Sequence, residues 1–362
     1  MTPRRVLMTT DTAGGVWTYA LELARGLSAV GVEIMLTVIG PGPSEAQRAE
    51  AIAIPGLVLV VAKLELEWQD RAGPLSPAAQ QQLLGLASAF EPDIVHCNGY
   101  REAAAGFAVP VVLVAHSCVR TWWRACRGEE LPLGWSAYAD GARAGLAAAT
   151  ALVAPSDAFL ADLSAAWGPL PRPRVIHNGL DIQVRPAAKQ PFILAAGRLW
   201  DEAKNVAPLA TIVPDLPWTV RLAGELPPGE DSAWPVEWAG RLQREQLLRV
   251  MSEAAIYVAP ARYEPFGLAI LEAAAAGCAL VLGSIPSLIE LWGDAARFVA
   301  SGDTPALRRT LLDLIDDPEA LDRLQAAARQ RAGDFSGRRM VERYLALYAQ
   351  VLRDAALEDR AA

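Results

Sequence analysis

The sequence predicts an α/β fold of two doubly wound domains, each built on a parallel sheet, that face each other across a cleft. Short apolar runs at residues 6–9, 111–115 and 256–259 are typical of buried parallel strands. The first and last of these runs lead into a glycine-bearing loop and then a helical pattern, the repeat of doubly wound folds. At 362 residues the chain is long for one hydrophobic core, so we expect two domains.

In the first domain, expected at residues 1–186, apolar runs predict strands and helical spacing predicts helices. The expected strands are residues 6–9, 32–39, 57–61, 93–97, 111–116 and 151–154. The expected helices are residues 18–30, 77–90 and one that begins after the N-cap Ser156. We expect residues 41–50 to be a polar connection and residues 118–132 an irregular loop.

The second domain is expected at residues 187–336, after a proline-bearing linker at 186–191. Its expected strands are residues 192–199, 219–223, 236–240, 256–259 and 279–282. Its expected helices are residues 243–253, 268–276 (ended by Gly277), 286–291 and two within 305–332. A last helix is expected at about 337–358.

The most informative stretch follows the strand at 256–259. Glu264 lies on the loop at the carboxyl end of this strand, the edge of an open sheet where ligands bind. The N–H groups of Gly267 and Leu268 open the next helix, where they have no partner inside the helix and can bind an anion. Glu272 lies just over one turn further on. Two carboxylates beside an anion site suit a ligand with hydroxyls and phosphates, although the spacing alone also fits two solvated glutamates.

Charge and cysteine usage limit the classes of partner. The net charge is −8 and no run of Lys or Arg stands out, so nucleic acid is not an expected partner. The four cysteines form no CxxC pair, which is typical of reduced thiols in a cytoplasmic protein. The apolar run near the N-terminus is too brief for a signal peptide or a membrane span.

The seven residues between Glu264 and Glu272, with Pro-Phe-Gly after the first glutamate, resemble the E-x7-E motif of family-4 retaining glycosyltransferases, which have the GT-B fold. This resemblance implies transfer of a sugar from a nucleotide-diphosphate donor to an acceptor hydroxyl. It implies that Glu264 contacts the donor sugar, that the helix start at Gly267 and Leu268 holds the diphosphate, and that Glu272 binds the ribose. Phe266 is a further expected donor contact. In GT-B proteins the last helix packs back on the first domain.

Further donor-site residues are implied by the same resemblance. The expected catalytic residues are Glu264, His116, Arg198 and Lys204. His116 lies at a strand end, and the cations Arg198 and Lys204 would offset charge on the leaving diphosphate. Lys204 comes one residue later than the family spacing, and Asn205 stands where glycine is usual. The remaining expected donor contacts are backbone groups of Gly14, Gly15, Arg241 and Leu242.

The other polar and aromatic candidates lie in the first domain. His96 also ends an expected strand and stays open between a structural and a functional role, whereas His177 is expected to be structural. Tryptophan stacks on sugar rings and arginine binds acidic groups, so an acceptor site is expected from Trp17, Tyr100, Arg101, Arg120 and Trp122. The alternative for each of these is a core or solvated side chain.

Three other functions remain open at this point. A GT-B epimerase or phosphorylase would share the fold and the phosphate-binding edge, and a non-catalytic subunit could bind the nucleotide sugar alone. A nicotinamide enzyme is disfavoured because the first loop lacks GxGxxG spacing. No Asp-x-Asp pair ends an expected strand, so we expect a metal-independent reaction without a cofactor. The acceptor could be a carbohydrate, a lipid-linked sugar or a small molecule, and peripheral membrane contact has no support in the sequence.

Overall fold

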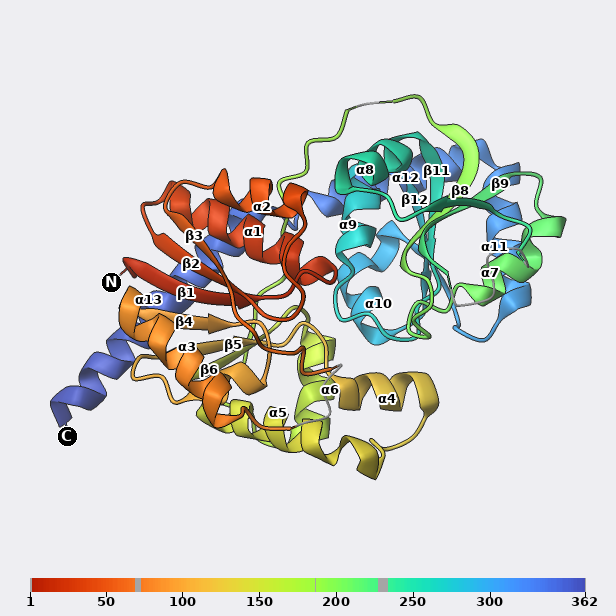
Figure 1. The fold of residues 1–362 in the computed structure, drawn as a ribbon. Coiled ribbons are helices and arrows are strands. Elements are labelled where there is room, and N and C mark those ends of the chain that lie inside the picture. The colour runs from red at the N-terminus through yellow and green to blue at the C-terminus, as the bar shows by residue number, and fades with distance from the viewer. Residues whose placement is uncertain (1, 69–72, 186, 227–233, 362) are drawn as a thin grey trace. The chain divides into compact units, whose positions relative to one another are not determined.

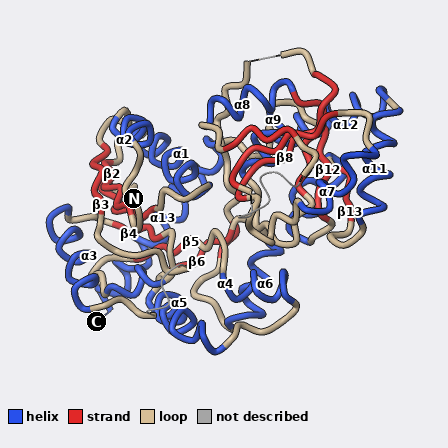
Figure 2. Tube along the Cα trace, turned by 45° about the vertical axis from the view of Figure 1, so that its right-hand side comes forward, coloured by secondary structure: helices blue, strands red, loops and turns tan. Residues whose placement is uncertain are grey.

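The computed structural model describes residues 2–68, 73–185, 187–226 and 234–361. The chain divides into two compact units (Figure 1). Unit 1 comprises residues 1–124, 129–181 and 337–362, and unit 2 comprises residues 125–128 and 182–336. Each unit has a parallel sheet with helices on both faces (Figure 2), so the predicted α/β class with two doubly wound sheets is confirmed.

Unit 1 contains a seven-stranded parallel sheet in the order β3-β2-β1-β4-β5-β6-β7. Its strands are β1 Arg5–Thr10, β2 Glu33–Val38, β3 Leu57–Val61, β4 Ile94–Cys97, β5 Val111–Val114, β6 Ala151–Ala154 and β7 Arg174–Val175. Its helices are α1 Gly15–Ala29, α2 Glu45–Ile52, α3 Pro77–Phe90, α4 Val119–Arg127, α5 Ser136–Ala148, α6 Asp157–Trp167 and α13 Gly337–Ala361, with short 3₁₀ turns at Arg101–Ala105 and Leu133–Trp135.

Unit 2 contains a six-stranded parallel sheet in the order β10-β9-β8-β11-β12-β13. Its strands are β8 Gln190–Arg198, β9 Thr219–Glu225, β10 Glu237–Gly240, β11 Ala254–Ala259, β12 Ala279–Gly283 and β13 Arg297–Val299. Its helices are α7 Ala207–Ile212, α8 Arg244–Glu253, α9 Leu268–Ala275, α10 Pro286–Trp292, α11 Thr304–Asp316 and α12 Pro318–Ala332, with 3₁₀ turns at Val213–Asp215 and Gly293–Ala295. Counted within this unit, the strand order is the 3-2-1-4-5-6 of the Rossmann fold.

Most predicted elements lie where the sequence placed them, because their local signals agree with their burial. The central strands are apolar on both faces and fully buried, as in β5 and β6. Helix ends follow side-chain caps: the Ser156 hydroxyl accepts from the Phe159 N–H and so starts α6. Gly277 ends α9 with φ 81°, the left-handed conformation expected for the residue after a helix.

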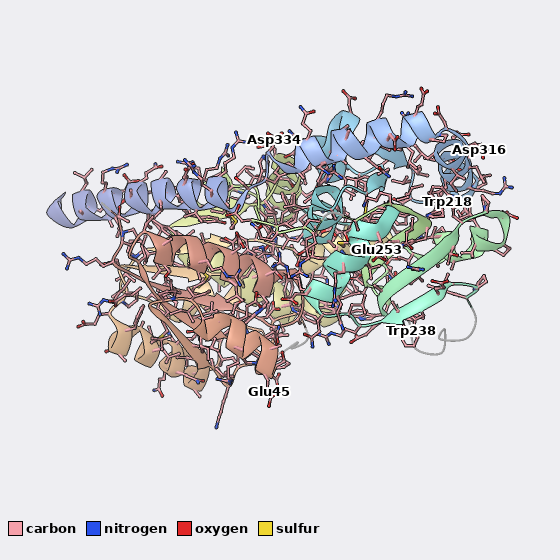
Figure 3. The ribbon with its side chains drawn as sticks, turned by 90° about the horizontal axis from the view of Figure 1, so that it is seen from above. Glu45, Trp218, Trp238, Glu253, Asp316 and Asp334 are labelled. Carbon is pink, nitrogen blue, oxygen red and sulfur yellow. The ribbon has the colours of Figure 1, made fainter. Side chains whose placement is uncertain are left out.

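Two stretches predicted to lack regular structure are helical, and both predictions were wrong. Residues 41–50 contain the start of α2, because Ser44 and Gln47 form a reciprocal capping box (Figure 3 labels Glu45, its first residue). Residues 118–132 contain α4, in which Val119, Trp122 and Cys126 recur at helical spacing opposite the arginines. The unusual density of Trp and Arg obscured that periodicity in the sequence.

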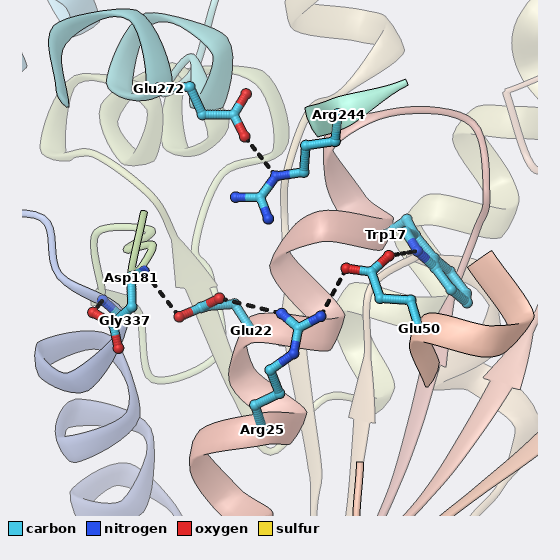
Figure 4. Close-up of polar contacts among 8 residues, drawn as sticks. All are labelled: Trp17, Glu22, Arg25, Glu50, Asp181, Arg244, Glu272 and Gly337. Carbon is cyan, nitrogen blue, oxygen red and sulfur yellow. Dashed lines mark hydrogen bonds and ion pairs between the residues drawn. The ribbon is translucent and has the colours of Figure 1, made fainter. Parts of the chain in front are cut away.

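The last helix belongs to unit 1, where α13 packs against α1. A chain of polar contacts fixes its first residue (Figure 4). The carboxylate of Asp181 accepts from the Gly337 N–H at 3.1 Å, and Glu22 on α1 accepts from the Asp181 N–H at 2.9 Å. A Cβ on Gly337 would lie 2.2 Å from Glu22 Oε1, so a larger residue would displace this carboxylate. Asp181 and Gly337, which lie at two of the points where the chain passes between the units, are thus tied to one buried glutamate.

Substitution of Gly224 tests the close backbone packing of β8 against β9 in unit 2. Gly224 has φ 139°, and a Cβ built on it would lie 1.9 Å from the carbonyl oxygen of its strand partner Gly197. We expect Gly224→Ala to lower the free energy of unfolding by more than about 2 kcal/mol, since backbone strain and overpacking add. Gly302→Ala is the matched control, because nothing lies within 4 Å of its Cβ. Urea denaturation showing equal stability for the two variants would contradict this account.

Candidate functional site

The candidate site in unit 2 lies at the carboxyl ends of β8 and β11. These two strands are neighbours, and the chain order of the sheet reverses between them. Ile256 pairs with Ile193 and Tyr257 with Leu194, so the loops that follow the two strands emerge at the same edge. In open α/β sheets this reversal point is where ligands bind.

The loop after β8 places Arg198 and Lys204 on a tight turn. The Asp201 N–H donates to the Arg198 carbonyl, and the Lys204 N–H donates to the Asp201 carbonyl. Arg198 is about half exposed, lies 3.3 Å from the Asp201 carboxylate and stacks over Trp200. Its guanidinium is therefore oriented by neighbours while remaining accessible from solvent.

Asn205 takes the left-handed backbone conformation at the position where the family usually has glycine. It has φ 51°, a left-handed conformation that asparagine tolerates better than most residues. Its buried amide donates to the carbonyls of Pro260 and Ser301, each at 2.8 Å. The departure from the family pattern thus ties the Lys204 loop to the end of β11.

Glu264 and Lys204 form an ion pair at this edge. Lys204 Nζ lies 2.5 Å from Glu264 Oε2, and both side chains are mostly buried. The Ser287 hydroxyl donates to the Glu264 carbonyl at 2.7 Å, which fixes the backbone of the loop. Both side chains line a cavity of about 20 Å³ beside Ala196 and Tyr257. This is room for one or two water molecules, so a sugar could be held only on the outer side of the pair.

The start of α9 lies immediately after this loop. Gly267 is the N-cap with φ 87°, and a Cβ there would lie 2.7 Å from Ile270 Cδ1 and 3.2 Å from Glu264 Cγ. Leu268 is the first residue of the helix, whose first N–H groups have no intrahelical acceptor and favour an anion. Phe266 is buried and packs edge-on against Phe335, so it anchors the loop from within.

Glu272 is buried within α9 and forms an ion pair that sequence reasoning missed (Figure 4). Arg244 Nε donates to its Oε1 at 2.8 Å. Burial raises the pKa of Glu272, and the charge of Arg244 opposes that rise. Arg244 is the first residue of α8, two residues after Leu242, and the only sequence signal for it was that proximity.

Arg241 and Leu242 lie on the loop between β10 and α8. Gly240 ends β10 with φ 66° and turns the chain. The Arg241 side chain is exposed and pairs with Glu225, whereas Leu242 is half-buried.

The corresponding edge of unit 1 carries a glycine turn and a hydrogen-bonded histidine. Gly14, with φ 133°, caps α1, and both it and Gly15 are exposed. His116 Nε2 lies 2.8 Å from Asn98 Oδ1, and the Asn98 amide nitrogen donates to the Thr9 carbonyl, which orients that oxygen toward the ring. His116 therefore donates from Nε2 and keeps Nδ1 as an acceptor. Desolvation lowers its pKa to about 3, so the ring is neutral at pH 7.

The other two histidines have structural partners. His96 is fully buried, its Nδ1 lies 2.7 Å from the Tyr348 hydroxyl on α13, and burial lowers its pKa to about 3. This contact explains why a histidine ends β4: it joins the sheet to the last helix. His177 donates from Nδ1 to the Pro155 carbonyl at 3.0 Å, as a structural loop residue would.

Three of the five expected acceptor residues are enclosed. Trp17 is 4% exposed and donates to Glu50, and the buried Tyr100 hydroxyl donates to the Ser117 carbonyl. Arg101 is 5% exposed and donates to the Glu65 carbonyl. Their burial favours a packing role and not stacking on a sugar.

The other two expected acceptor residues lie on α4 and are more accessible. Trp122 and Arg120 are half-buried, and Arg120 lies over the Trp167 ring, 5.3 Å from its centroid. Arg120 and Arg124 share the carboxylate of Glu130. The helix thus presents an ordered arginine surface beside an indole.

Within residues 2–68, 73–185, 187–226 and 234–361 no group of three or more His, Cys, Asp or Glu side chains is placed to hold a metal ion. No helix in those ranges is long and apolar enough to cross a membrane.

Comparison with protein-family models identifies both halves of the chain. Residues 13–184 match the model described as Glycosyltransferase Family 4, and residues 190–317 match the model described as Glycosyl transferases group 1. The chain belongs to glycosyltransferase family 4. The family predicted from the E-x7-E motif is therefore confirmed.

Known relatives agree with this assignment. The family-4 chain is 31% identical over 287 residues to glycogen synthase of Mycobacterium tuberculosis, across 68% of this chain and 66% of that protein. It is 25% identical over 309 residues to alpha-maltose-1-phosphate synthase of Mycolicibacterium smegmatis, across 71% of this chain and 79% of that protein. The match thus spans about two thirds of the glycogen synthase.

Solved structures share the fold over nearly the whole chain. The TM-score is 0.79 with sucrose-phosphate synthase from Thermosynechococcus elongatus, at 18% identity and covering 97% of this chain and 100% of that one. It is 0.72 with WaaG, a glycosyltransferase involved in lipopolysaccharide biosynthesis, at 15% identity and covering 95% and 99%. At these identities the likeness shows the fold alone, and it confirms the predicted GT-B architecture.

Proposed function

We propose that this family-4 chain is a retaining glycosyltransferase that moves a sugar from a nucleotide-diphosphate-sugar donor to an acceptor hydroxyl. The observation that carries the proposal is the Lys204–Glu264 ion pair, which lies with Arg198 at the order reversal of the second sheet and next to the start of α9. A carboxylate, two cations and a helix N-terminus converge there within one unit. This combination suits a ligand with sugar hydroxyls at one end and a diphosphate at the other.

The same groups suit a front-face reaction. As the glycosidic bond breaks, negative charge grows on the leaving diphosphate, and Arg198, Lys204 and the N–H groups at the start of α9 would stabilise it. The diphosphate would then assist deprotonation of the incoming hydroxyl on the same face of the sugar. Glu264, held by Lys204, would accept hydrogen bonds from donor-sugar hydroxyls. In unit 1, the neutral His116 would offer its Nδ1 as an acceptor to a sugar hydroxyl, as the family resemblance implies.

Finer proposals concern the acceptor, the compartment and the independence from metal ions. The acceptor is a carbohydrate, a lipid-linked sugar or a small molecule bound against unit 1, and nucleic acid is not a partner because the chain is acidic. We place the enzyme in the cytoplasm, since its four cysteines are free thiols. Because cations of the chain itself face the diphosphate, transfer is expected to persist in EDTA.

The proposed function is tested first on the donor. Thermal shifts with UDP, GDP and ADP should single out one base, because a ligand at a hundred times its Kd adds roughly 2.7 kcal/mol. The matching nucleotide sugar should then be hydrolysed slowly and transferred faster to an acceptor, with the anomeric configuration kept in the product. Interconversion of the donor sugar would instead identify an epimerase, and a requirement for inorganic phosphate would identify a phosphorylase. Binding without turnover would identify a non-catalytic subunit.

Arg198 is expected to act on the transition state more than on the ground state. Arg198→Ala should lower kcat by roughly 100-fold and raise the donor KM much less, since charge on the diphosphate grows during the reaction. Arg308→Ala, which removes an exposed arginine of the same unit, is the control. Steady-state kinetics with raised KM and normal kcat for Arg198→Ala would reduce this residue to binding alone.

The α4 surface is the proposed acceptor contact, now restricted to Arg120 and Trp122. Arg120→Ala and Trp122→Ala should each impair transfer by roughly 10-fold or more while sparing slow donor hydrolysis, because only transfer requires a bound acceptor. Arg143→Ala is the matched control, since Arg143 also lies over the Trp167 ring. Equal loss of both reactions, or loss in the Arg143 variant as well, would assign the arginines to packing.

A further inference from the structure

Arg244 holds a position for which the family resemblance provides no role. It begins α8, directly after the loop of Arg241 and Leu242, and packs toward α9. Its Nε donates to Glu272 Oε1 at 2.8 Å, where the glutamate side chain is 9% exposed and the arginine 33% (Figure 4). The contact joins α8 and α9 at a buried carboxylate.

A buried carboxylate needs a compensating charge to remain ionised. Burial raises the pKa of Glu272, and Arg244 lowers it. Of the other elements packed on α9, β11 contributes the neutral phenol of Tyr257, and α12 places the Arg329 guanidinium against Gly277, at the far end of the helix. Arg244 is therefore the cation that controls the ionisation of Glu272.

The second feature of Arg244 is an unsatisfied donor. Its Nη2 is buried and has no hydrogen-bond partner among the residues that the structure describes. A buried guanidinium N–H without an acceptor costs free energy. An unsatisfied donor of this kind in a folded protein therefore calls for an explanation. A ligand oxygen next to Glu272 would provide the missing acceptor.

We propose that Arg244 is a nucleotide-binding residue, which positions the Glu272 carboxylate through Nε and donates from Nη2 to a ribose hydroxyl oxygen of the donor. A ribose diol can donate its protons to a carboxylate and accept from a guanidinium at the same time. Glu272 and Arg244 together could therefore satisfy both the donor and the acceptor capacity of the ribose hydroxyls. This inference rests on the proposed function, since it requires a nucleotide on α9.

The test measures Kd for UDP, GDP and ADP by calorimetry in wild type, Arg244→Gln, Arg244→Lys, Glu272→Gln and the double variant, at pH 7 and pH 9. Arg244→Gln should weaken binding roughly 10-fold to 100-fold at pH 7. The loss should be smaller at pH 9 than at pH 7 relative to wild type, because removal of Arg244 raises the pKa of Glu272 and the higher pH favours its ionised form. Arg244→Lys should retain more affinity at pH 7, since it keeps the charge.

Two controls separate ligand contact from a purely structural pair. Glu272→Gln should be weak at both pH values, and adding Arg244→Gln should cost little more, since both residues act on the same hydroxyls. Arg249→Gln, on the exposed side of the same helix, should bind like wild type. The 2′-deoxy form of the bound nucleotide should bind less well than the ribonucleotide in wild type, and this preference should shrink in Arg244→Gln.

The possible outcomes distinguish failure of the role proposed for Arg244 from failure of the proposed glycosyltransferase function. If wild type binds none of the three nucleotides, the proposed function fails and the role of Arg244 fails with it. If wild type binds one of them and Arg244→Gln binds equally well, or loses affinity equally at both pH values and keeps the ribose preference, only the role of Arg244 is overturned.

Discussion

The parallel pairing of β8 with β11 is the constraint on which the candidate site depends. Parallel strands that are hydrogen-bonded in register end at the same edge, so two loops about 60 residues apart in sequence must emerge together. The order reversal at this pair keeps any crossover helix from covering that edge. Lys204 and Glu264 meet for this reason, and the Asn205 amide then ties the Lys204 loop to Pro260 after β11 and to Ser301 after β13.

Unit 1 repeats this topology around β1 and β4 but equips it with different chemistry. Its edge carries the Gly14 turn and an amide–imidazole pair between Asn98 and His116, where the ring is neutral because it is desolvated. At the corresponding edge of the second unit the Lys204–Glu264 ion pair lies beside Arg198. The same topology therefore carries different side chains in the two units.

Two buried glutamates, one in each unit, are offset by specific partners. Glu272 depends on Arg244, and Glu22 is satisfied by the Asp181 N–H and by Arg25. The first pair joins α8 to α9, whereas the second fixes Asp181 and, through it, the start of α13. Desolvation would penalise either glutamate alone, so each pair marks a position that packing by itself does not explain.

The sequence by itself determined the α/β class, the family and most element positions, because these depend on local periodicity, capping residues and a motif contained in one strand-loop-helix. It also placed Glu264, Gly267 and Glu272 on that element. Only the tertiary structure decided the partners: Asn98 for His116, Arg244 for Glu272 and Tyr348 for His96 come from distant segments that meet through strand order. It likewise decided that Trp17, Tyr100 and Arg101 are enclosed, since burial depends on packing between elements and not on residue type.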